Sequence, residues 1–293
     1  MEPPAPKYNR KPDWLKIKLP KGENYLKVKG ILEEQGLHTI CVSGKCPNLG
    51  ECWSAGTATF MILGDTCTRN CRFCSVTSGK PNKVNKDEPD LIAKAVIELG
   101  IKYAVITSVT RDDLDDYGSQ HFAATINAIR AADKNIKIEV LVPDFCGDEK
   151  AIQTVAHAKP DVFNHNIETV RNLYSKVRPE ADYERSLNVL KYVKKINTDI
   201  LTKSGIMVGL GESFEEISET LCDLKDFLCD IVTVGQYIQP TKNHLQTERF
   251  LHPDEFKTIE LEAKRIGIKH VFAGPLVRSS YKANEVFPDG FQK

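Results

Sequence analysis

The chain has 293 residues, of which 41% are apolar and 27% charged, a composition typical of soluble globular proteins. Its 40 basic and 40 acidic residues cancel, so no global charge favours binding to nucleic acid or to a membrane surface. The sequence also lacks an apolar run of the roughly 20 residues that a membrane-spanning helix needs. Residues 1–20 are rich in proline and lysine and lack the apolar core of a signal peptide. We therefore interpret them as an extended surface arm.

The chain contains nine cysteines and no recognisable export signal. This combination indicates a reducing compartment, in which clustered thiols bind metal more often than they pair as disulfides. We expect a cytoplasmic location, although an organellar protein trimmed of its transit peptide would look the same.

From Thr59 onward, short apolar runs rich in β-branched residues alternate with segments of helical periodicity. The apolar runs predict strands at Phe60–Leu63, Tyr103–Val109, Ile136–Val142, Asp161–Ile167, Ile206–Leu210 and Ile231–Ile238. The segments between them predict helices at Leu91–Leu99, His121–Ala132, Glu149–His157, Tyr183–Ile196 and Phe214–Leu228. A last helix is expected over Pro253–Ile266, followed by a short apolar run over His270–Ala273.

Continuous apolar strands that alternate with helices predict a parallel sheet covered on both faces. Six such units predict an α/β fold built as a partial (β/α)6 TIM-like barrel, and a doubly wound open sheet is the alternative. We divide the chain into an N-terminal cysteine-bearing extension (residues 1–55), the partial barrel (56–268) and a C-terminal extension (269–293).

Three cysteines, Cys67, Cys71 and Cys74, follow the first predicted strand with the spacing C-x3-C-x2-C. The carboxyl ends of parallel strands are where α/β proteins place their active sites. Three soft thiolates in a tight loop suit an iron–sulfur cluster that keeps one iron open. A zinc knuckle completed by a remote histidine, or reactive surface thiols, are the alternatives. With Phe73 before the last cysteine, the loop resembles the C-x3-C-x-aromatic-C signature of the radical S-adenosylmethionine (SAM) superfamily. The resemblance implies a 4Fe-4S cluster whose open iron binds SAM and cleaves it to a 5′-deoxyadenosyl radical.

A second set of three cysteines, Cys41, Cys46 and Cys52, has the spacing C-x4-C-x5-C and also lacks a fourth ligand. The segment around it resembles the auxiliary-cluster segment of the lipoyl synthase family. The resemblance continues through blocks between about residues 10 and 285, among them 57–65, 107–114, 164–169, 203–212, 235–237 and 274–281. It departs mildly where Val42-Ser43-Gly44 replaces expected acidic residues and at Thr110 and Ile238. None of these departures removes a ligand.

The lipoyl synthase resemblance implies a second 4Fe-4S cluster, completed by a serine hydroxyl from the segment Arg278-Ser279-Ser280-Tyr281. Ser280 is our preferred ligand and Ser279 the alternative. An oxygen ligand is harder than a thiolate and matches iron–sulfur chemistry less well, so it suits a ligand released during turnover.

Three residues at predicted strand ends are candidates for SAM binding: Glu168 by the resemblance, and Gly209 and Gly211 because a missing side chain lets the backbone approach a ligand closely. Arg178, before Pro179, could face the carboxylate of SAM or of the substrate. The alternatives are an N-cap or an ordinary salt bridge for Glu168, a surface position for Arg178, and a tight strand-to-helix turn for the glycines. Helix capping explains Asp112 and Asp113 cheaply. We expect the other polar and thiol candidates, His165, Cys146, Cys222 and Cys229, to be core residues.

The family resemblance implies a sulfurtransferase of lipoate biosynthesis, which inserts sulfur at C6 and C8 of a protein-bound octanoyl-lysine and consumes the auxiliary cluster as donor. The implied partners are octanoylated carriers (the lipoyl domains of 2-oxoacid dehydrogenase E2 subunits and the glycine cleavage H protein), a ferredoxin- or flavodoxin-type electron donor and a cluster-repair protein. Neither nucleic acid nor membrane is expected as a partner. A methylthiotransferase-like radical SAM enzyme and a non-enzymatic zinc or iron–sulfur protein are the alternatives.

Overall fold

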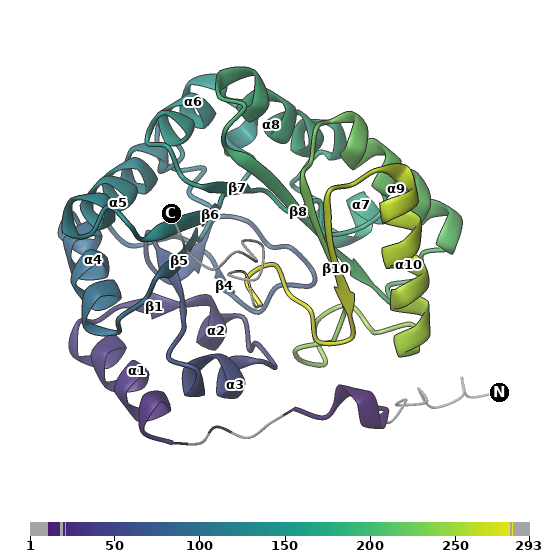
Figure 1. Cartoon of the computed structure of the whole chain (residues 1–293), viewed down its shortest axis with the longest axis horizontal. Helices are drawn as coiled ribbons and strands as arrows, with labels where there is room; N and C mark the ends of the chain where they lie inside the picture. The colour runs from purple at the N-terminus through teal and green to yellow at the C-terminus, as the bar shows by residue number, and fades with distance from the viewer. Residues whose placement is uncertain (1–10, 18–19, 21, 282, 284–293) are drawn as a thin grey trace.

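A curved, mostly parallel sheet forms the centre of the molecule in our computed structural model, which describes residues 11–17, 20, 22–281 and 283 (Figure 1). Within these residues the strand order is β1-β2-β5-β6-β7-β8-β9-β10, with β1 antiparallel to β2 and the other neighbours parallel. The strands are β1 (His38–Thr39), β2 (Thr59–Ile62), β5 (Tyr103–Ser108), β6 (Lys137–Leu141), β7 (Val162–Asn164), β8 (Leu201–Val208), β9 (Ile231–Gln236) and β10 (His270–Gly274).

Six helices lie on the outer side of this sheet (Figure 1). They are α4 (Glu88–Glu98), α5 (Ser119–Ala132), α6 (Glu149–His157), α8 (Tyr183–Ile196), α9 (Phe214–Asp226) and α10 (Pro253–Ile266). Their buried faces join the sheet in two large apolar clusters, one centred on residues such as Phe60 and Ile106 and the other on residues such as Leu221 and Phe256. The predicted α/β partial barrel is therefore confirmed, and β5 and β9 are buried along nearly their whole length, as their continuous apolar runs predict.

Most strands lie within two residues of their predicted bounds, but β7 ends at Asn164 rather than at Ile167, and β8 differs more. β8 begins at Leu201, five positions before the predicted Ile206, because the polar residues Thr202, Lys203 and Ser204 are buried strand residues. β10 pairs in parallel with β9, so the predicted C-terminal extension opens with a strand of the sheet itself.

The N-terminal extension packs beside β2 through α1 (Glu23–Glu34), α2 (Ile40–Ser43) and α3 (Leu49–Ser54). Within the same extension, the short helix η1 (Asp13–Leu15) contacts the segment before α10, where the indole Nε1 of Trp14 donates to the carbonyl of Leu251 at 3.1 Å. Much of the predicted surface arm, residues 1–10, 18 and 19, lies outside the described residues.

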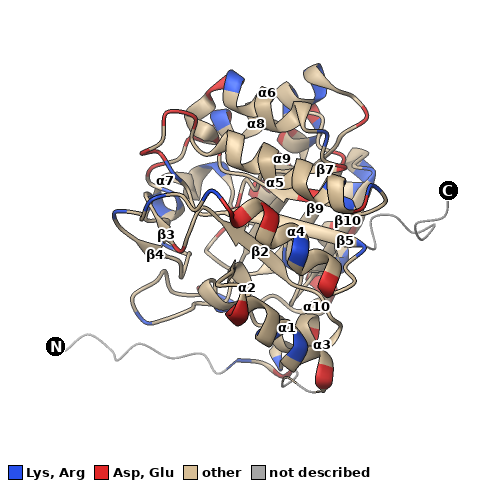
Figure 2. Cartoon of the chain, turned by 90° about the vertical axis from the view of Figure 1, so that its left-hand side faces the viewer, with Lys and Arg blue, Asp and Glu red and all other residues tan. Residues whose placement is uncertain are grey.

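Shorter elements complete the chain: β3 (Thr66–Cys67), β4 (Thr77–Ser78), η2 (Phe145–Gly147), η3 (Arg171–Leu173) and α7 (Tyr174–Val177). In the described part of the chain, no helix is long and apolar enough to cross a membrane. On the face seen in Figure 2, acidic and basic residues are interspersed over the helices and loops.

Candidate active site

The loop that carries Cys67, Cys71 and Cys74 leaves the carboxyl end of β2, as predicted. The pairing of β3 with β4 closes it into a compact unit. The thiol of Cys67 accepts hydrogen bonds from the backbone N–H groups of Arg69 at 3.4 Å and Thr110 at 3.3 Å. Backbone hydrogen bonds, such as that from the N–H of Arg72 to the carbonyl of Val177 at 3.0 Å, tie the loop to α7. The loop is thus held from the barrel side as well as by its own strands.

The three thiols of this loop lie close enough to influence one another. Burial raises the pKa of the Cys74 thiol to about 12, and the charges of Cys71 and Cys67 add to the rise. Burial also raises the pKa of Cys71, while the guanidinium of Arg178 opposes that rise. Desolvated, mutually repelling thiols are poor anions by themselves, and iron stabilises them as thiolates. The donor set therefore fits an iron–sulfur cluster.

Glu168 and Arg178 both reach this site from the segment between β7 and α8. Glu168 adopts a left-handed φ of 70° and is fixed to β8, where its N–H donates to the carbonyl of Gly205 at 2.8 Å. Burial raises the pKa of its carboxyl group, although Arg178 and Asn166 lower it. Arg178 is only 8% exposed, so the surface alternative for this residue is wrong.

The guanidinium of Arg178 is only partly satisfied. Its Nη1 donates to the carbonyl of Asn166 at 2.9 Å and to the hydroxyl of Tyr174 at 2.7 Å. Its buried Nε has no partner among the described residues. An unpaired donor on a buried cation, beside Cys71 and Glu168, fits a site for an anionic ligand group. A role for either residue in SAM binding remains a prediction.

Gly209 and Gly211 have φ values of 98° and 111°, which favour glycine. A Cβ on Gly209 would lie 2.1 Å from Nε2 of Gln236 and 2.5 Å from the carbonyl oxygen of Arg249. The missing side chain at Gly209 is therefore required by protein packing, which supports the tight-turn alternative there. Their contact with SAM stays a prediction.

The second set of three cysteines lies on α2, α3 and the turn between them. The hydroxyl oxygen of Thr39 accepts from the N–H of Cys41 at 3.0 Å and caps α2. Burial raises the pKa of Cys52 to about 12, and Cys41, Cys46 and Glu51 contribute to the rise. Burial and the Cys41 charge also raise the pKa of Cys46, whereas Arg278 lowers it. These cysteines therefore form a second thiol cluster, with the C-terminal arginine beside it.

The Arg278-Ser279-Ser280-Tyr281 segment reaches this second thiol cluster from the other end of the chain. The amide Nδ2 of Asn48 donates to the carbonyl of Leu276 at 2.7 Å, and the hydroxyl of Tyr281 donates to Glu51 at 3.2 Å. Ser279 is hydrogen-bonded to Asn166, whereas the Ser280 hydroxyl has no partner among the described residues. This difference favours Ser280 as the fourth ligand, which remains a prediction.

Other expectations had mixed outcomes. His165 is buried, as predicted; its Nδ1 lies 2.8 Å from the Val142 carbonyl, and burial lowers its pKa to about 4. Cys229 is buried, but Cys146 and Cys222 are exposed, so the core assignment was wrong for these two. Cys229 lies beyond the end of α9. Among the described residues, no group of three His, Cys, Asp or Glu side chains is arranged to hold a single metal ion.

Sequence reasoning missed two residues of the site. Arg69, within the cysteine loop, is buried and forms ion pairs at 2.7 Å with both Asp112 and Asp144, so Asp112 anchors the loop as well as being a capping candidate. Asn166 contacts both Glu168 and Ser279. Alternation of polar residues at a strand end was the only available signal for Asn166.

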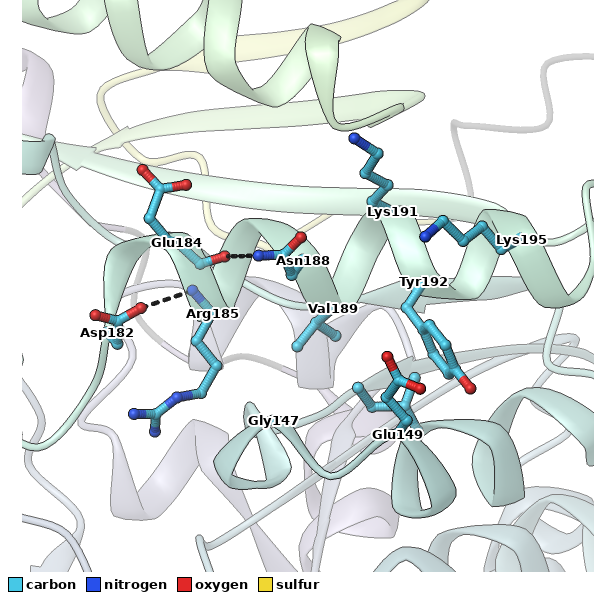
Figure 3. A pocket seen from close by; sticks show the side chains of 11 residues that line it. Gly147, Glu149, Asp182, Glu184, Arg185, Asn188, Val189, Lys191, Tyr192 and Lys195 are labelled. Carbon is cyan, nitrogen blue, oxygen red and sulfur yellow. Dashed lines mark hydrogen bonds between the residues drawn. The ribbon is translucent and has the colours of Figure 1, made fainter.

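A groove between α6 and α8, with a volume of about 430 Å³, lies on the outer helical layer (Figure 3). Its lining residues, among them Glu149, Arg185 and Lys195, include no member of either thiol cluster or of the C-terminal segment. It is therefore separate from the candidate active site.

The fold and the C-x3-C-x2-C loop define a class of protein. The model of the radical SAM superfamily matches residues 61–224, so the chain belongs to this superfamily. The structure resembles methylornithine synthase, with a TM-score of 0.51 and 16% identity over 75% of this chain and 72% of that one. It also resembles SuiB of Streptococcus suis bound to S-adenosylmethionine, with a TM-score of 0.58 and 12% identity over 77% and 54% of the two chains. At these identities the likeness shows the fold alone.

Within that superfamily, the chain belongs to the lipoyl synthase family. The model of the N-terminal domain of lipoyl synthase matches residues 4–46. Curated lipoyl synthases from Caldanaerobacter subterraneus subsp. tengcongensis and Caldicellulosiruptor bescii are 52% and 54% identical over 94% of this chain and 96% and 95% of their own lengths. The protein from Flavobacterium johnsoniae is 51% identical over 97% of this chain and 96% of its own. The chain is thus an enzyme of the radical SAM, sulfur-inserting kind, and its family uses SAM and a 4Fe-4S cluster.

Proposed function

We propose that this enzyme inserts two sulfur atoms, at C6 and C8 of an octanoyl chain attached to a carrier-protein lysine. The observation that supports this most is the course of the C-terminal segment past both thiol clusters. Leu276 and Tyr281 are hydrogen-bonded to Asn48 and Glu51 beside one cluster. Ser279 is linked through Asn166 to Glu168 beside the other. A radical formed at one site could therefore be used next to a sulfur source at the other.

Each thiol cluster has the donors for one 4Fe-4S cluster, so we infer two per chain. Cys67, Cys71 and Cys74 would hold the first, and Cys41, Cys46, Cys52 and Ser280 the second. When bound, these groups and SAM supply the electron, the 5′-deoxyadenosyl radical and the inserted sulfur. Arg178 and Glu168 would orient SAM through its carboxylate and its polar groups, and Gly209 and Gly211 would shape the neighbouring turn.

Burial at the barrel mouth supports radical chemistry on an unactivated carbon. Val177, Leu210 and Tyr237 form a buried apolar cluster against which Phe73 of the cysteine loop packs. The loop after β9 closes over the same place, where Nε2 of His244 lies 2.9 Å from the carbonyl oxygen of Cys74. A covered, apolar surrounding excludes water from a reactive intermediate.

The substrate class that follows is a lipoyl-domain protein, and we infer octanoylated E2 lipoyl domains and the glycine cleavage H protein. A ferredoxin- or flavodoxin-type donor would supply electrons, and a repair protein would rebuild the consumed cluster. Neither nucleic acid nor a membrane is part of this proposal, and the cytoplasmic location stays an expectation from the sequence. A methylthiotransferase-like activity, and a zinc or iron–sulfur protein without activity, lack the family matches that support lipoyl synthesis.

The test is a turnover assay of the anaerobically reconstituted chain with an octanoylated carrier peptide, SAM and a strong reductant. Two molecules of 5′-deoxyadenosine are expected per lipoyl product, from protein that holds iron and sulfide for two clusters. Zinc without sulfide, or iron for only one cluster, would contradict the proposal.

A further inference from the structure

Asn166, which lies just beyond β7, joins the two halves of the candidate active site through its carboxamide. Its Nδ2 lies 2.7 Å from Oγ of Ser279 and 3.0 Å from Oε1 of Glu168. Its Oδ1 accepts from the Ser279 hydroxyl at 2.9 Å. Asn166 is only 8% exposed, and its partners Ser279 and Glu168 are half-buried. One buried side chain therefore touches both the C-terminal segment and the carboxylate beside the first thiol cluster.

Ser279 and Ser280 occupy the middle of a turn closed by the N–H of Tyr281, which donates to the carbonyl of Arg278 at 3.0 Å. Ser279 is packed against β8, where a Cβ on Gly205 would lie 2.8 Å from both its Oγ and Oδ1 of Asn166. Fixing one serine in this turn also fixes the position of its neighbour.

Other contacts hold the residues on either side of Ser279 and Ser280. Leu276 is held by Asn48, Tyr281 contacts Glu51, and Ala283 packs against Tyr103 and Val105. Among the described residues, the Asn166–Ser279 contact is the side-chain hydrogen bond that reaches the two central residues of the turn.

The geometry points to Asn166 as a positioning residue, which holds Ser279 so that Ser280 is presented to the auxiliary cluster, and which orients Glu168 at the same time. This inference rests on the proposed function, because it assumes that Ser280 completes that cluster. The two serines then have different roles: Ser279 fixes the turn, and Ser280 is the exchangeable ligand. Because the same amide contacts Glu168, a movement of the turn would also shift the Glu168 carboxylate beside the first thiol cluster.

The test compares Asn166→Ala, Ser279→Ala, the double variant and Asn166→Asp, each as reconstituted full-length enzyme. The first readout is the rate at which a chelator removes iron from the auxiliary cluster. Asn166→Ala and Ser279→Ala should each raise this rate about fivefold, the equivalent of one lost hydrogen bond. The double variant should raise it no further, because both substitutions break the same contact.

Asn166→Asp separates the two contacts, since a carboxylate accepts from Ser279 but places a like charge beside Glu168. Iron retention should return to near the wild-type value, whereas SAM binds about tenfold more weakly. Hydrogen exchange of the 276–281 amides gives a readout without turnover, and should speed up in Asn166→Ala. Asn188→Ala is the matched control, because that amide donates to the Glu184 carbonyl at 2.9 Å on the exposed side of α8.

Wild-type iron release and exchange rates in both alanine variants would overturn the inference, as would additive effects in the double variant. If the wild-type chain held only one cluster, the proposed function would fail first, and the inferred presentation of Ser280 would fail with it. If the wild-type chain holds two clusters and the variants behave like it, only the inferred role of Asn166 is contradicted.

Discussion

Lys203→Met should destabilise the enzyme strongly, although Lys203 is in neither thiol cluster. Lys203 and Glu139 are 1% and 0% exposed on the inner side of the sheet. Nζ of Lys203 lies 2.9 and 3.0 Å from the two carboxylate oxygens of Glu139. Tyr103 and Asn164 donate to the same carboxylate at 2.7 and 3.1 Å. Burial and the Glu139 charge raise the pKa of Tyr103, which keeps its hydroxyl a donor.

The magnitude follows from what Glu139 keeps after the substitution. Removing one partner of a buried ion pair costs about 3–5 kcal/mol, because the other charge stays buried. Two neutral donors remain on Glu139, so we expect the lower end, about 3 kcal/mol. The double variant Glu139→Gln, Lys203→Met should recover at least half of the loss. Its new amide can donate to Oδ1 of Asn164, which has no partner among the described residues.

Urea unfolding of the reconstituted protein, followed by circular dichroism, gives the free energy of unfolding for each variant. The control is Lys94→Met, in an exposed pair 3.7 Å from Glu98 on α4, where a loss of about 0.5 kcal/mol or less is expected. A Lys203→Met loss no larger than that of the control would refute the reasoning.

Three further outcomes are expected. Arg178→Met should weaken SAM binding by about 10-fold or more in equilibrium titrations, since charged hydrogen bonds contribute about 1.5–3 kcal/mol; an unchanged affinity would contradict its role. Burial raises the pKa of Asp144, but the Arg69 guanidinium lowers it further, to about 2. Asp144 therefore stabilises the fold fully above its unfolded pKa of about 4, and this contribution is lost as the pH falls towards 2. Asp144→Asn should therefore flatten the stability profile between pH 4 and 2, and an unaltered profile would count against this. Burial raises the pKa of Cys52 and Cys74 to about 12, so cluster assembly must release protons from these thiols. Assembly should therefore become more favourable from pH 7 to about 8.5 in calorimetric titrations. Assembly that does not depend on pH would argue against thiolate ligation.

Local pattern predicted the elements well wherever one face of the element was apolar. The bounds of α6, α8 and α10 agree with the predicted helices, because each has a clear apolar stripe. The start of β8 was missed because a lysine such as Lys203 is normally expected at the surface. Its burial depends on the pair with Glu139, which is 64 positions away in the sequence. Glu168 was expected at a strand end, but its left-handed backbone lies past the end of β7.

The site was predictable where its ligands are close in sequence and not where they come from distant segments. The C-x3-C-x2-C spacing of Cys67, Cys71 and Cys74 is enough to predict an iron–sulfur loop from the sequence. By contrast, the contact between Asn166 and Ser279 spans 113 positions and depends on how the C-terminal segment lies against the sheet. The burial of Arg178 likewise follows from tertiary packing, which a single sequence does not encode in any local pattern.

The central claim is that the two thiol clusters perform different tasks. The most direct measurement is the ratio of SAM cleaved to sulfur inserted in two single-cysteine variants. Cys41→Ala should still cleave SAM but make no lipoyl product, whereas Cys71→Ala should lose both activities. Lipoyl product from Cys41→Ala, or SAM cleavage by Cys71→Ala at the wild-type rate, would contradict the account.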